Sequence, residues 1–270
     1  MDAYYPSSRD LRFQDLSIHI ATIMNTGDIE ALCEALATLP RHVADTALFR
    51  VAQFNQVGLL EPVVSRCGAD VNAVDPRTDD TVLHVAADNR AFETVQALLA
   101  AGAAADKKNK RGNSALMAAV QQLVWQNLPG RAAATITALL SAGYVHSRDI
   151  WSEETPLTFA AGLGNMEVVK QLLAAGAPVN SPAKVPIYRR EGDAPTGFWA
   201  PLHAAASKGD KAMVSLLLAE GADPNGRDKK GRTPLHHAST EETYESGCYE
   251  LLRAAGADKD AYDSDYKFPR

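Results

Sequence analysis

An internal repeat dominates the sequence and restricts the fold more than any other feature. Three windows align without gaps: LHVAADNRAFETVQALLAAGA from Leu83, LTFAAGLGNMEVVKQLLAAGA from Leu157 and LHAAASKGDKAMVSLLLAEGA from Leu202. In each window the opening Leu lies 19 residues before the Gly of the closing Gly-Ala. A unit this short cannot bury its apolar face alone, so such units stack against their neighbours. The repeat therefore predicts a solenoid.

Further copies extend the repeat over nearly the whole chain. Windows from Leu48, Leu116 and Leu235 fit with one, eight and two extra residues, and a weaker match starts at Ile20. We expect a single domain over residues 1–270. Its predicted repeats cover about 16–40, 44–74, 79–106, 112–146, 153–180, 198–225 and 231–260, with insertions at about 120–131 and 181–197.

The start of the last window identifies the repeat. Residues 233–238 read Thr-Pro-Leu-His-His-Ala, and the spacings from Leu83 to Leu116 and from Leu202 to Leu235 are both 33 residues. The unit resembles the ankyrin repeat, which has a T-P-L-H-x-A signature in about 33 residues. The resemblance implies an all-α ankyrin-repeat solenoid of about seven helix-turn-helix repeats, with short hairpin fingers and a polar N-terminal capping repeat.

The residue types within a unit explain this expected shape. Thr-Pro can open a helix, because Thr caps it and Pro fits the first turn. Small residues such as 204–206 allow the first helices to approach closely, and bulky aliphatics such as Leu217 bury the second helix against its neighbours. Stacking small first helices inside bulky second helices curves the array. We expect a concave face built from fingers and first helices.

Departures from the repeat suggest where a partner binds. The first insertion contains Trp125, which either packs a lengthened helix pair or anchors a partner. The second lengthens one finger and holds Tyr188, Arg189, Arg190, Phe198 and Trp199. Exposed Arg with aromatic residues is typical of binding sites, although the aromatics could instead pack against the adjacent repeat.

All three tryptophans fall in or beside the middle of the array, since Trp151 lies in the finger between the insertions. We therefore centre the expected site there, with basic finger tips favouring an acidic partner segment. Charged finger tips can also be merely solvated. The predicted partner-binding residues are Trp125, Trp151, Glu153, Tyr188, Arg189, Arg190, Phe198, Trp199, Lys110, Arg111, Lys229, Lys230, Arg232, Asp88, Arg90 and Gln121.

No motif in the sequence specifies catalysis. There is no HExxH, no GxSxG, no His/Cys cluster and no Gly-rich phosphate loop. His84, His203 and His236 occupy the family motif position, where the resemblance implies a structural bridge between adjacent fingers. We expect no enzyme, no catalytic residues, no cofactor and no metal. The alternative is a small-molecule or enzymatic pocket between the two insertions, with Glu153, Glu154 or Asp193 as acid or base.

Composition limits the other classes of partner. The formal net charge is −6, which argues against nonspecific nucleic-acid binding. No apolar run is long enough for a membrane span, and the first residues lack the apolar core of a signal peptide. Three widely spaced cysteines favour a reducing interior, each as a small packing residue. We expect a cytoplasmic monomer, with the nucleus also open, that binds a protein or peptide; a self-associating scaffold is a further alternative.

Overall fold

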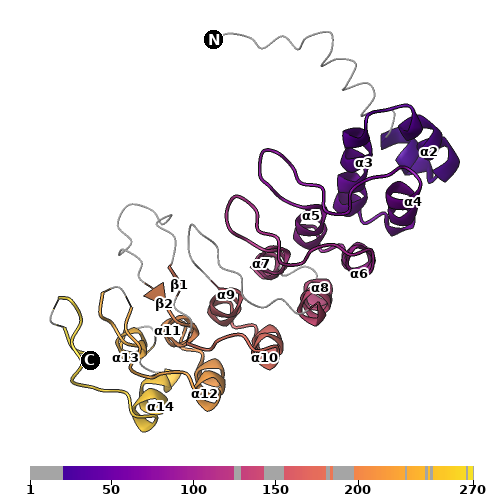
Figure 1. The fold of residues 1–270 in the computed structure, drawn as a ribbon. Helices are drawn as coiled ribbons and strands as arrows, with labels where there is room; N and C mark the ends of the chain where they lie inside the picture. Colours follow the sequence, from indigo (N-terminus) through magenta and orange to yellow (C-terminus); the bar gives the residue numbers. More distant parts are fainter. Residues whose placement is uncertain are drawn as a thin grey trace, which may run out of the picture. The chain divides into compact units, whose positions relative to one another are not determined.

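The computed structural model describes residues 21–124, 129–142, 155–180, 183–184, 198–228, 230–240, 243, 246–265 and 267–269. The chain divides into two compact units, residues 1–104 and residues 105–270. Each unit is a stack of short helices and is described here by itself (Figure 1).

Unit 1 is built from paired helices that follow one another along the chain. Its elements are α2 (Ile29–Ala37), α3 (Arg41–Phe54), the 3-10 turn η1 (Val57–Leu59), α4 (Leu60–Ser65), α5 (Val82–Asp88) and α6 (Phe92–Ala100). Helix α3 packs against α5, and α4 packs against both α2 and α6. The first and second helices of successive pairs therefore stack in separate rows.

Unit 2 repeats this arrangement. Its elements are α7 (Ala115–Gln121), the 3-10 turn η2 (Gln122–Val124), α8 (Pro129–Ser141), α9 (Pro156–Gly162), α10 (Met166–Ala174), β1 (Ala183–Lys184), β2 (Phe198–Trp199), α11 (Pro201–Ser207), α12 (Lys211–Ala219), α13 (Pro234–Ala238) and α14 (Cys248–Ala254). Helix α9 packs against α7 and α11, and α11 also packs against α13. Helices α8, α10, α12 and α14 form the second row (Figure 1). The two short strands pair antiparallel.

Local signals in each repeat set the helix boundaries. The side chain of Thr155 accepts a hydrogen bond from the Thr158 amide at 3.1 Å, and Pro156 occupies the first turn of α9. At the other end of a pair, Gly221 adopts φ +86° after α12, a conformation that glycine enters without steric cost. As expected, a Thr-Pro pair begins the first helix of a repeat and a Gly ends the second.

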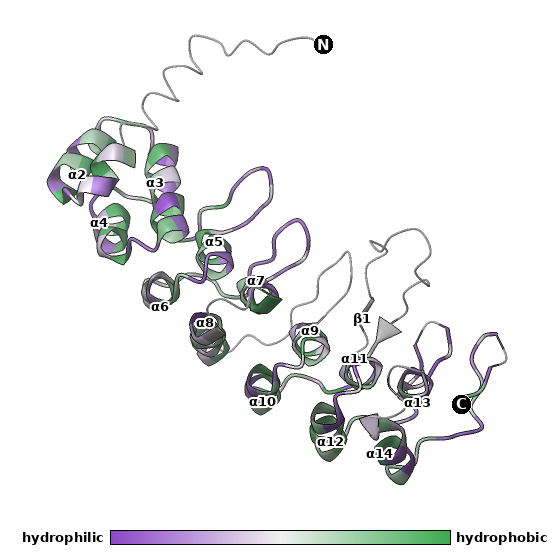
Figure 2. Cartoon of the chain, turned by 180° about the vertical axis from the view of Figure 1, so that it is seen from behind, coloured by the Kyte–Doolittle hydropathy of each residue, from purple (hydrophilic) through white to green (hydrophobic). Residues whose placement is uncertain are grey.

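Small residues fill the first row of helices and larger aliphatic residues fill the second. Ala160, Ala161 and Ala205 are fully buried, as are Val169 and Leu172 of α10. Small side chains let the first helices pack closely, while the larger ones supply most of the buried apolar area. Figure 2 shows the resulting contrast between the helices, which carry the apolar residues, and the hydrophilic fingers that precede α5 and α7. The all-α prediction is confirmed.

Asparagine side chains join the base of one finger to the next repeat. Asn225 donates to the Gly256 carbonyl at 3.0 Å and accepts from the Asp258 amide at 2.8 Å. Asn180 makes the same two bonds to Gly221 and Asp223. In each case one amide side chain satisfies both a donor and an acceptor of the neighbouring backbone, so the finger bases are held at a fixed spacing.

Asn225→Ala should therefore lower the free energy of unfolding of the chain by about 1–2 kcal/mol, because two inter-repeat hydrogen bonds are lost at a partly solvated position. Urea denaturation followed by circular dichroism measures this. Asn89→Ala is a suitable control, since the Asn89 amide donates to the Val85 carbonyl of its own helix. Equal losses in the two variants would contradict an inter-repeat role for Asn225.

Candidate binding surface

The described fingers of unit 2 are closed by one repeated device. Asn109, Asp228 and Asp263 each use Oδ1 to accept hydrogen bonds from the amides two and four residues further along, at distances of 2.8–3.0 Å. A side-chain acceptor at this place satisfies the backbone of a tight turn. The finger tips are therefore ordered before any partner arrives.

The Asp228 carboxylate also binds side chains. Its Oδ2 accepts from Arg232 Nε at 2.9 Å, lies 2.8 Å from Arg232 Nη2, and lies 3.2 Å from His237 Nε2. The Asp228 side chain has no exposed surface. Burial opposes ionisation of this carboxyl group, but the hydrogen bonds from His237 and Arg232 outweigh it and hold its pKa well below the usual range. Asp228 is a charged centre that orders the finger.

The histidines at the motif position link adjacent fingers. His203 Nδ1 accepts from the Ala200 amide at 3.1 Å, so Nε2 carries the proton and donates to the carbonyls of Gly226 and Arg232 at 3.1 and 3.2 Å. His236 makes the corresponding bonds to the Thr233 amide and the Lys267 carbonyl. The structural role expected for these two residues is confirmed by this geometry.

Two of the fingers of unit 2 also carry basic side chains. On the finger before α7, Lys107, Lys108, Lys110 and Arg111 are exposed. On the finger before α13, Lys230 is half-buried, and Arg227 is exposed but donates from Nη1 to the carbonyls of Gly231 and Tyr262 at 3.0 and 2.8 Å. Arg232 is 22% exposed and contacts Asp228, so its guanidinium is held within its own finger. The acceptor oxygens of the turns thus face inward, while many of the cationic groups face solvent.

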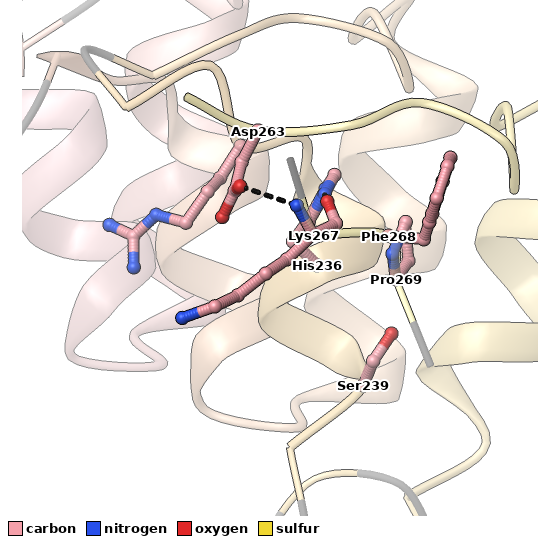
Figure 3. Close-up of a pocket in the computed structure, with 7 residues that line it drawn as sticks. His236, Ser239, Asp263, Lys267, Phe268 and Pro269 are labelled. Carbon is pink, nitrogen blue, oxygen red and sulfur yellow. Dashed lines mark hydrogen bonds between the residues drawn. The ribbon is translucent and has the colours of Figure 1, made fainter. Parts of the chain in front are cut away.

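A groove lies beside α13 at the last described finger. It has a volume of about 620 Å³ and is lined by Arg232, His236, Ser239, Asp263, Lys267, Phe268 and Pro269. Figure 3 shows these side chains, with the Asp263 carboxylate turned toward the Lys267 amide of its own finger. Next to the groove, the Phe268 ring meets Tyr262 edge-on at 6.4 Å, and both rings are more than half exposed.

This aromatic pair was not among the residues predicted from the sequence, although the sequence carries a signal for it. Asp263 follows Asp228 by 35 residues, close to one repeat, and both open a turn that ends in a basic residue four positions later. The residues around Asp263 are therefore a finger. Exposed aromatic rings on a finger are typical contact residues.

In unit 1, two predicted contact residues lie at the end of α5. Asp88 is exposed, and Arg90 is half-buried with φ +56°. Arg90 occupies the repeat position that Gly164 and Gly209 fill in unit 2. A left-handed conformation is strained for a residue with a side chain, and such strain often marks a functional position. Arg90 therefore stays a predicted contact residue.

The remaining predicted residues are placed only in part. Gln121 is half-buried at the end of α7. Phe198 and Trp199 form β2, which pairs with β1. The rest of the predicted set, and with it the alternative pocket between the insertions, falls outside the described residues: Trp125, Trp151, Glu153, Tyr188, Arg189, Arg190 and Lys229.

The paired helices and ordered fingers define a helical repeat protein, and comparison with known families identifies which one. The family model described as "Ankyrin repeats (3 copies)" matches residues 48–143 and 187–263, and the "Ankyrin repeat" model matches residues 152–184. The chain belongs to the ankyrin repeat family. Domains of this family are generally protein–protein interaction modules.

Curated relatives resemble the chain over a small part of their own length. The human mitochondrial disaggregase is 34% identical over 103 residues, which are 37% of this chain and 13% of the relative. A homologue of transient receptor potential cation channel subfamily A member 1 from Caenorhabditis elegans is 29% identical over 189 residues, 60% of this chain and 14% of the relative. L-asparaginase from Dirofilaria immitis is 30% identical over 171 residues, 63% of this chain and 25% of the relative. The chain spans a quarter or less of these relatives.

Solved ankyrin repeat domains share the fold over most of the chain. An ankyrin repeat domain from Acinetobacter baumannii has a TM-score of 0.63 at 29% identity, covering 78% of this chain and 98% of that chain. The ankyrin repeat domain of Bcl-3 has a TM-score of 0.65 at 22% identity, covering 82% and 91%. Among the described residues, no helix is long and apolar enough to cross a membrane, and no three His, Cys, Asp or Glu side chains are grouped to hold a metal ion.

Proposed function

We propose that this chain binds a partner protein or peptide through its fingers and first helices, and that the bound segment is acidic. The observation that carries the proposal is the arrangement of charge in the two fingers that precede α7 and α13. The Oδ1 atoms of Asn109 and Asp228 accept hydrogen bonds from backbone amides of their own turns. Lys107, Lys108 and Arg111, in contrast, are exposed to solvent. A partner at these tips therefore meets a locally basic surface on a chain of net negative charge.

Order within the fingers supports binding without a large entropic cost. Hydrogen bonds to Asp228 Oδ1 close the finger before α13, and His203 joins that finger to the start of α11. Asn225 links the base of the same finger to the next repeat. A surface that is already ordered loses little conformational freedom when a partner docks. Charges on such a surface chiefly raise the association rate and select against basic partners.

The proposal extends to residues that the structure places only in part or not at all. The aromatic and basic residues of the two insertions are proposed as further contacts, since they neighbour the first helices in the sequence. The proposed set is Trp125, Trp151, Glu153, Tyr188, Arg189, Arg190, Phe198, Trp199 and Lys229, with Asp88, Arg90, Lys110, Arg111, Gln121, Lys230 and Arg232.

Charge reversal on one finger tests the proposal. Peptides selected by display on the immobilised chain should be rich in Asp and Glu. Lys107→Glu/Lys108→Glu should weaken their binding at least tenfold in fluorescence anisotropy, because two attractions become repulsions. The loss should shrink as salt is added.

The matched control is Lys170→Glu/Lys211→Glu, which makes the same charge change on exposed residues of α10 and α12. Circular dichroism first confirms that both variants fold. The control should bind within about twofold of the unchanged chain, since screening at physiological salt limits the reach of surface charges to about 8 Å. Selected peptides without acidic residues, or equal losses in both variants, would contradict the proposal.

A further inference from the structure

Two cysteine side chains meet in unit 1. Cys33 lies in α2, and Cys67 follows the end of α4 by two residues. Their Sγ atoms are 3.2 Å apart, and both are free, half-buried thiols. The two residues are 34 positions apart, which is about one repeat, so stacking of α2 on α4 brings them together. A disulfide bond of about 2 Å needs only a further approach of roughly 1 Å.

A cation accompanies the thiol pair. Arg66 precedes Cys67 in the chain and donates to both carboxylate oxygens of Glu30 at 3.1 and 2.8 Å, and negative charge on either cysteine raises the pKa of Arg66. Positive charge favours a thiolate, which is the reactive form of cysteine. Burial, together with the Cys33 side chain, raises the pKa of Cys67 to about 12, so Cys67 remains a thiol near neutral pH.

We propose that Cys33 and Cys67 form a reversible oxidative modification site, at which a peroxide converts the two thiols into a disulfide that joins α2 to the end of α4. In the first step one of the two cysteines, as its thiolate, attacks a peroxide oxygen and the O–O bond breaks. That cysteine becomes a sulfenic acid, and the other peroxide oxygen leaves as hydroxide, which takes up the proton released by the thiol and becomes water. In the second step the sulfur of the other cysteine attacks the sulfenic sulfur, the S–O bond breaks, and the hydroxyl group leaves as a second water with the proton of the attacking thiol. Overall, two thiols and one hydrogen peroxide give one disulfide and two waters.

The bond would restrain α2. A cross-link between residues 34 positions apart lowers the conformational entropy of the unfolded chain. It would also prevent α2 from separating from α4. Cys248 offers an internal comparison, because it is fully buried in α14 of unit 2 and is not expected to react.

The test treats the full chain with one equivalent of hydrogen peroxide at neutral pH. We expect the product to be lighter by two hydrogen atoms, to lose two titratable thiols and to yield one peptide pair linked through Cys33 and Cys67. Its melting temperature should rise by about 4–8 °C, and dithiothreitol should reverse every change. The disulfide should form at least tenfold faster in the native chain than in urea, because the fold holds the sulfurs together.

Two variants separate this proposal from general thiol reactivity. Cys33→Ser should abolish both the linked peptides and the rise in melting temperature, whereas Cys248→Ser should leave both unchanged. Three outcomes would overturn the proposal: sulfinic acid without a cross-link, a disulfide between two chains as the main product, or equal rates in the native and the unfolded chain. None of these measurements depends on partner binding.

Discussion

Replacing Asp228 with alanine should lower the free energy of unfolding by about 3 kcal/mol, because one side chain serves four donors. The variant would leave the amides of Lys230 and Arg232 without their acceptor and would remove the carboxylate beside Arg232 and His237. Breaking a buried charge network strands the remaining partners, which costs more than the loss of one exposed contact. Urea denaturation at pH 7 measures the change.

Two comparisons show which bonds carry this effect. Asp263→Ala removes the same turn closure from the next finger, where the described bonds of Asp263 are those to the amides of Asp265 and Lys267. We expect it to cost about 1 kcal/mol. Asp228→Asn, which keeps an oxygen acceptor but loses the charge, should fall between the two. If Asp228→Ala and Asp263→Ala were equally destabilising, turn closure alone would explain the role of Asp228.

The fold could be predicted because each repeat carries its own boundaries. Thr155 with Pro156 starts α9, Gly221 ends α12, and the structure uses both as their residue types predict. Stacking follows from the alternation of small and bulky apolar residues, which depends on sequence period alone. Long-range contacts at a repeat spacing, such as Asn225 to Asp258, could also have been found by aligning the repeats.

The charged network was not predictable from the same pattern. In the sequence, Arg232 is one of several basic residues on a finger, and residues of that kind are usually solvated or available to a partner. Arg232 turns inward because the Asp228 side chain is fully buried there, where His237 contacts it as well. The Cys33–Cys67 contact was hidden for a related reason. The motifs by which cysteine sites are recognised require close spacing, whereas these two meet only because α2 and α4 stack.

Acidification should destabilise the chain well before its carboxylates titrate, because His203 is held neutral. Burial, together with the nearby His237 side chain, lowers the pKa of His203 to about 4, from an ordinary value of 6.5. The unfolded chain therefore binds a proton between these pH values that the folded chain does not. Stability must fall as the pH decreases from about 6.5 to about 4, and it is fully present above that window. Asp228, whose pKa is lowered, adds a further loss only below about 4.

Another repeat of the chain suggests a substitution that tests whether His203 causes the acid sensitivity. At the same repeat positions, α9 carries Thr155 and Thr158, whose hydroxyl groups lie 2.9 Å apart and do not titrate in this range. Ala200→Thr/His203→Thr copies that arrangement into α11. The unchanged chain should lose on the order of 2 kcal/mol between pH 7 and pH 4.5, and the double variant should lose clearly less, even if it is less stable at pH 7. Urea denaturation at several pH values gives both slopes. If the free energy of unfolding fell equally with pH in both chains, the acid sensitivity would come from other groups. His203 would then not need to remain neutral for the fingers of α11 and α13 to stay joined.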